Sequence, residues 1–156
     1  MNNREISSQL QKLNDLIAKT GLMSSVDLEL QSHWAKYLCV LTAGFLENAI
    51  KELYMDYVRR SARSAPLAKY ASDRISRVTN PNAETFLQIT YNFDKSWGHS
   101  LETFLDVDGR ADALNSIMKH RNKIAHGRNS DITIVRLKEY LKRALDVLDH
   151  LETQCL

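Results

Sequence analysis

Three side chains near the end of a predicted helix are of the types that phosphodiester chemistry needs. Arg121, Asn122 and His126 lie in the sequence Arg-Asn-Lys-Ile-Ala-His-Gly. Histidine has an unperturbed pKa near neutrality, so His126 can take a proton from a ribose 2′-hydroxyl or give one to the leaving oxygen. Arg121 offers a planar fork of donors to phosphate oxygens in the transition state. Asn122 shares a helix face with His126 and can orient the imidazole or the phosphate.

The helix that carries these residues is predicted to stop at Gly127, because glycine adopts the left-handed conformation just past a helix end without a Cβ penalty. Before it, apolar residues recur at helical spacing: Leu114, Ile117, Met118, Ile124 and Ala125. Arg121 falls within this apolar stripe, where a guanidinium is costly unless it is paired. A second, polar stripe beside it holds Asn115, Lys119, Asn122 and His126. Arg121 and His126 point about 140° apart, so they can flank one phosphate only at a groove or a subunit interface.

Length and composition fit a soluble globular protein. The 156 residues are 44% apolar and 26% charged, which suits a single domain spanning residues 1–156 with a real core. Neither the two cysteines nor the histidines have metal-ligand spacing, and we expect no metal and no cofactor. No signal segment and no apolar run of roughly 20 residues is present, so we expect a cytoplasmic protein that does not enter a membrane.

Helical periodicity runs through the whole chain, and prolines and glycines are few. The predicted fold is all-α, an up-and-down bundle of four to five main helices with short accessory helices. The expected helices cover residues 6–17, a long stretch from a capping box at Ser24 and Asp27 to Arg60, a short helix from Pro66, residues 80–91 and 96–106, a helix from an Asp108 cap to Gly127, and a last helix capped by Ser130 or Asp131.

Two basic clusters indicate an anionic partner. Around the motif, four basic residues occur without an acid between them: Lys119, His120, Lys123 and Arg128. A second basic stretch covers residues 59–77, with Asp73 as its one acid. Together they predict a positive rim that tracks an RNA backbone. Aromatic residues do not interleave with these cations, so sequence-specific base reading is not expected.

The stretch from Arg121 to Gly127 resembles the Arg-x4-6-His motif of the HEPN superfamily of α-helical domains, in its common Arg-Asn-x-x-Ala-His form. The position also matches, because the motif ends the penultimate long helix and one more long helix follows. The segment from Phe45 to Leu53 resembles the earlier long helix of the branch named RiboL-PSP-HEPN. Within that segment, Glu47 and the adjacent Asn48 adjoin the buried centre of the helix and are candidates to support Arg121.

This resemblance implies a metal-independent endoribonuclease that leaves a 2′,3′-cyclic phosphate, with a composite site at a homodimer interface. It also implies a toxin or antiviral defence effector whose partners are RNA and an antitoxin or defence protein. In the HEPN toxins paired with a nucleotidyltransferase antitoxin, a modified tyrosine follows two residues after the motif histidine. Arg128 occupies that position here, so neutralisation by tyrosine modification is not predicted.

Two alternatives remain open from the sequence. The chain can be a non-catalytic HEPN module that dimerises or binds RNA or a protein. It can also be a plain helical scaffold in which Arg121 pairs with Glu47, Glu52 or Asp112 inside a monomer, since buried ion pairs are weak evidence of function.

Overall fold

The computed structural model describes residues 3–22 and 27–156, and this part of the chain forms helices without any strand. The predicted all-α class is confirmed. The helices are α1 (Arg4–Ala18), η1 (Lys19–Leu22, a 3₁₀ turn), α2 (Leu28–Ser61), α3 (Ala65–Ser76), α4 (Ala83–Phe93), α5 (Lys95–Leu105), α6 (Arg110–Ala125) and α7 (Ile134–Cys155). None of the described helices is long and apolar enough to cross a membrane.

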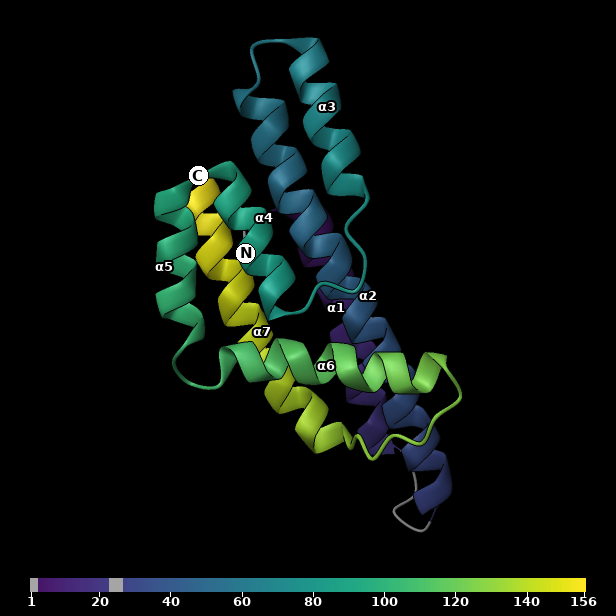
Figure 1. Cartoon of the computed structure of the whole chain (residues 1–156). Helices are drawn as coiled ribbons and strands as arrows, with labels where there is room; N and C mark the ends of the chain where they lie inside the picture. The colour runs from purple at the N-terminus through teal and green to yellow at the C-terminus, as the bar shows by residue number, and fades with distance from the viewer. Residues whose placement is uncertain (1–2, 23–26) are drawn as a thin grey trace.

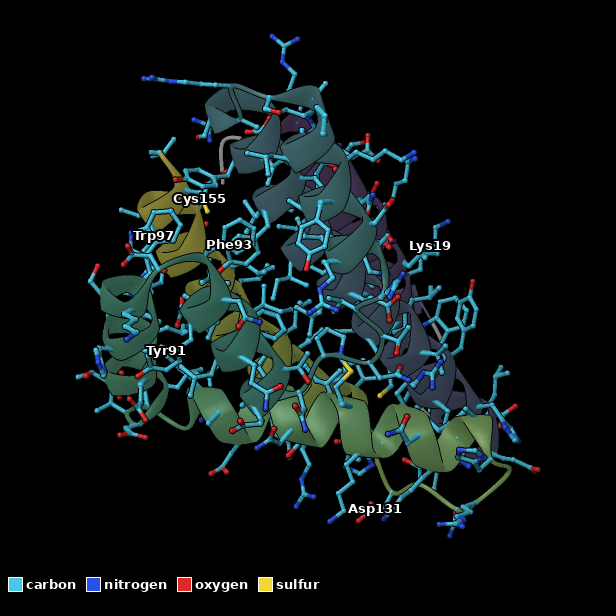
Figure 2. All side chains as sticks on the ribbon, turned by 45° about the horizontal axis from the view of Figure 1, so that its top comes forward. Lys19, Tyr91, Phe93, Trp97, Asp131 and Cys155 are labelled. Atoms are coloured by element: carbon cyan, nitrogen blue, oxygen red, sulfur yellow. The ribbon has the colours of Figure 1, made fainter. Side chains whose placement is uncertain are left out.

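Helix α2 is the central helix of the bundle, as its uncharged middle segment predicts. It packs against α1, α3, α6 and α7, and its residues Leu38, Leu46 and Ile50 are fully buried. A single hydrophobic cluster joins residues from all seven α-helices, from Ile6 in α1 to Cys155 in α7. Figure 2 shows Phe93, Trp97 and Cys155 at one end of the molecule, whereas Asp131 lies at the opposite end.

Helix α6 runs across α2 and α7 instead of alongside them (Figure 1), with its C-terminal end on the α2 side, away from α5. Ile117 is fully buried, and the Cys39 thiol on α2 lies 3.8 Å from its carbonyl oxygen. This crossing buries the apolar face of the first half of α6 and brings its last turns to the edge of the bundle. The motif residues therefore lie where solvent and a ligand can reach them.

The predicted caps of α6 and α7 differ in the structure, and the predicted capping box of α2 is described only in part. Gly109, with φ +66°, is the N-cap of α6, and Asp108 (φ +57°) instead places its carboxylate 2.9 Å from Arg110 Nη2. Thr133 caps α7, because its side chain accepts the Arg136 N–H, and neither Ser130 nor Asp131 does so. The proposed capping residue Ser24 lies outside the described residues, and Asp27 itself caps α2 by accepting the Leu30 N–H at 2.8 Å.

Candidate functional site

The end of α6 is closed by backbone hydrogen bonds of the Schellman type. The Arg128 N–H donates to the Lys123 carbonyl at 2.8 Å, and the Gly127 N–H donates to the Ile124 carbonyl at 3.1 Å. Gly127 has φ +64°, the left-handed conformation that this arrangement requires. The predicted stop at Gly127 is confirmed. It leaves His126 exposed as the C-cap, just after the last helical residue Ala125.

A groove of about 670 Å³ opens beside this end of α6. One wall is α6, and the other is the start of α4 with the segment that precedes it. The α6 side and the residues just beyond it supply Asn115, Met118, Lys119, Asn122, Lys123, His126 and Arg128, and the α4 side supplies Asn80, Asn82, Ala83 and Glu84. Five residues assigned to the site from the sequence therefore share one groove: Lys119, Asn122, Lys123, His126 and Arg128.

Arg121 lies on a different side of α6 from the groove. Its side chain is half-buried, and its Nη1 donates to the Asn122 Oδ1 at 3.2 Å. Asn122 thus contacts the Arg121 guanidinium and also lines the groove, on the adjacent face of α6. Within one chain, Arg121 and His126 diverge as helical spacing predicts.

Glu47 anchors the far wall of the groove to α2. One carboxylate oxygen accepts the Lys51 Nζ at 2.8 Å, and the other accepts the Asn80 N–H at 2.8 Å. Partial burial alone would raise the Glu47 pKa, but Lys51, the Asn80 N–H and the charge of Arg121 together lower it. Glu47 therefore holds the backbone of Asn80 and feels the charge of Arg121. Asn48 is exposed on α2 and is not among the groove residues.

His120 does not face the groove. Its ring is 9% exposed, and its Nδ1 lies 2.9 Å from the Ser130 hydroxyl, in the loop that follows α6. Burial lowers the His120 pKa, against a raising effect from Asp131. His120 therefore lies outside the groove with its ring against Ser130, and its assignment to RNA binding stays a prediction.

This burial predicts a pH-dependent stability. Because the pKa of His120 is lower in the folded chain, the unfolded chain binds the proton more readily, and stability is lost as pH falls through about 6.5. The free energy of unfolding, measured with urea, should fall less between pH 7.5 and pH 5.5 in His120→Gln than in the wild type. The exposed His33 provides the control, since His33→Gln should lose as much as the wild type. Equal losses in both variants would contradict the prediction.

The second basic cluster starts on α2 and continues through α3, which runs back beside α2. It begins at the far end of α2, where Arg60 lies about 20 Å beyond Glu47 at the rise of an α-helix. Arg59 contacts Glu52 at 2.6 Å, and Arg60 contacts Asp56 at 3.0 Å, so their charges are partly neutralised. Figure 1 shows the α2–α3 turn at the end of the molecule opposite α6. The cations on α2 are thus remote from the groove, whereas Arg77 comes only three residues before the groove residue Asn80, and the predicted rim stays a prediction there.

Four polar groove residues were not among the predicted site residues: Asn80, Asn82, Glu84 and Asn115. Asn115 lies on the same polar stripe of α6 as Asn122, and this spacing was the available signal. Asn80 and Asn82 come next to α6 only through the packing of α4, which local periodicity does not report.

An all-helical fold with an Arg-x4-His motif at the end of the penultimate long helix defines a HEPN domain. The family model RiboL-PSP-HEPN matches residues 2–156. The chain belongs to this family. A search among curated proteins and a search among solved structures found no match.

Proposed function

We propose that this chain is a metal-independent endoribonuclease that acts as a homodimer with a composite active site. In biological terms it would be a cytoplasmic toxin or antiviral defence effector, controlled by an antitoxin or another defence protein. One observation carries the proposal. An exposed histidine, His126, lies in a groove with Lys119, Lys123 and Arg128, where a proton-transfer group and a polyanion can meet.

The reaction requires two proton transfers. The ribose 2′-oxygen attacks the phosphorus and loses its proton, and the bond from phosphorus to the 5′-oxygen breaks as that oxygen gains a proton. The products are a 2′,3′-cyclic phosphate and a 5′-hydroxyl. His126 serves as base or acid, and the guanidinium of Arg121 stabilises the charge that builds on the phosphate oxygens.

In the proposed dimer, a second copy of the chain brings its Arg121 close to His126 of the first copy, which one copy alone does not do. On α2, near its crossing with α6, four exposed positions share one helix face: Tyr37, Val40, Gly44 and Asn48. A Cβ placed at Gly44 would meet no atom within 4 Å, so a partner can approach closely there. We propose this face as the contact through which Arg121 of one copy completes the groove of the other.

The direct test is incubation of the purified protein with single-stranded RNA in EDTA. We expect cleavage that leaves 2′,3′-cyclic phosphate ends and a dimer by light scattering. Absence of cleavage would remove the enzyme proposal, and a monomer would remove the composite site.

The second candidate is a non-catalytic HEPN module that binds RNA or a protein. The position of Arg121 outside its own groove favours this candidate if no partner copy completes the site. It predicts RNA binding without cleavage and unchanged binding in His126→Ala.

A further inference from the structure

Of the four asparagines that line the groove, Asn82, Asn115 and Asn122 turn their carbonyl oxygens toward protein donors. Asn82 Oδ1 accepts the Thr85 N–H at 2.9 Å, and Asn115 Oδ1 accepts the Ala83 N–H at 3.0 Å. Asn122 Oδ1 accepts from Arg121 Nη1 at 3.2 Å. Backbone N–H and guanidinium nitrogens can only donate, so these contacts fix which end of each amide is which.

The NH₂ ends of these amides remain for a ligand. Across residues 3–22 and 27–156, no protein acceptor contacts the Nδ2 atoms of Asn82, Asn115 or Asn122. Together with Lys119 and Lys123, they make the groove a surface of donors. Glu84 is the one acid in its lining, and one of its carboxylate oxygens accepts from Gln88 Nε2 at 2.9 Å.

A donor surface of this kind suits phosphate oxygens better than base edges. Bidentate reading of adenine by asparagine uses the carbonyl oxygen and the NH₂ group together. In Asn82 and Asn115 the carbonyl oxygen is already engaged, so only the donor half is offered. An acceptor-only group such as a phosphodiester matches what is left.

The groove is also longer than one phosphate. From Asn115 to His126, α6 rises about 16 Å, and Lys119 lies one turn after Asn115 on the same face. Asn82, Asn115 and Lys119 are thus grouped at the end of the groove away from His126.

We infer that Asn82, Asn115 and Lys119 form a second phosphate subsite, which binds a backbone phosphate of RNA other than the one that is cleaved. The inference rests on the proposed function for the identity of the polymer as RNA. The subsite positions the strand without reading its sequence, and it belongs to a single subunit.

The test uses a single-stranded RNA oligonucleotide with 2′-O-methyl groups, which lacks the attacking hydroxyl and reports binding alone. Asn115→Asp keeps the oxygen that accepts the Ala83 N–H and replaces the NH₂ group by a negative oxygen. Asn82→Asp does the same while remaining a good helix cap. Fluorescence anisotropy should show that each variant binds on the order of tenfold more weakly than the wild type.

Two further variants make the test specific. Asn92→Asp adds the same charge at an exposed asparagine near the other end of α4, outside the groove, and should bind like the wild type. Glu84→Gln removes the acid but keeps an oxygen for Gln88, and it should bind more tightly. This gain does not depend on how well the two Asp variants fold, which circular dichroism checks separately.

The subsite is overturned if folded Asn82→Asp and Asn115→Asp bind the oligonucleotide as tightly as Asn92→Asp does. It is also overturned if Glu84→Gln does not bind more tightly than the wild type, or if the wild type does not bind the oligonucleotide. Cleavage of unmodified RNA in EDTA is scored separately. Binding that depends on the asparagines without cleavage supports the subsite and removes the nuclease. Cleavage with normal binding by Asn115→Asp removes the subsite alone.

Discussion

Replacing His126 by alanine should lower the rate of RNA cleavage by about 10²–10⁴-fold, which is the usual contribution of general acid–base catalysis by one side chain. The ring is exposed at the end of α6, and the helix stop beside it is made by backbone groups, so the variant should fold normally. The measurement is the single-turnover cleavage rate of a labelled RNA in EDTA, with the protein in excess.

The matched control for this prediction is His33→Ala. His33 is also exposed on a helix but lies on α2 outside the groove, so its removal should leave the cleavage rate unchanged. Binding of the 2′-O-methyl oligonucleotide by His126→Ala should stay close to that of the wild type, because Lys119 and the asparagines remain. A full cleavage rate in His126→Ala would show that the proton moves through another group.

The second large effect is expected from dimers that combine two inactive chains. Arg121→Ala should itself lower cleavage by about 10²–10³-fold, as loss of a charge-stabilising donor does. If each site takes Arg121 from one copy and His126 from the other, a mixed dimer of Arg121→Ala with His126→Ala contains one complete site. Doubly tagged, co-purified mixed dimers should recover about half of the wild-type activity, since a symmetric dimer has two equivalent sites.

A reciprocal pairing distinguishes the two arrangements. A wild-type chain joined to the double variant Arg121→Ala, His126→Ala has no complete site if the residues act across the interface. It keeps one complete site if both act within one chain. Activity in this dimer, with none in the mixed dimer of single variants, would place the site inside a single subunit.

The helices could be predicted from the sequence because their signals are local. The three-four apolar repeat and the left-handed glycine marked both the course of α6 and its end at Gly127. The predicted N-cap of α6 was wrong. Asp108 is a common capping residue, but in the structure its carboxylate contacts Arg110 and Gly109 is the N-cap. Such competition between two short-range contacts is decided by the loop geometry, which residue type alone does not give.

The site was predictable only in part, for a related reason. Lys119, Asn122, Lys123, His126 and Arg128 share the groove because they lie close together along the chain. The buried position of His120 could not be predicted, because its partner Ser130 lies in the loop that follows α6. The Ala83 N–H on α4 donates to Asn115 Oδ1 on α6, and this bond brings the neighbouring Asn82 close to Asn115. No local sequence pattern predicts such a contact between two helices.

The backbone closure of α6 has a consequence for how this protein can diversify. The hydrogen bonds that end the helix come from main-chain groups of Lys123, Ile124, Gly127 and Arg128, and of these residues only Gly127 is required for its conformation. The exposed side chains just beyond it, Arg128, Asn129 and Asp131, can therefore change without displacing His126. Under the proposed function, substrate preference and partner recognition can change at these positions while His126 keeps its place.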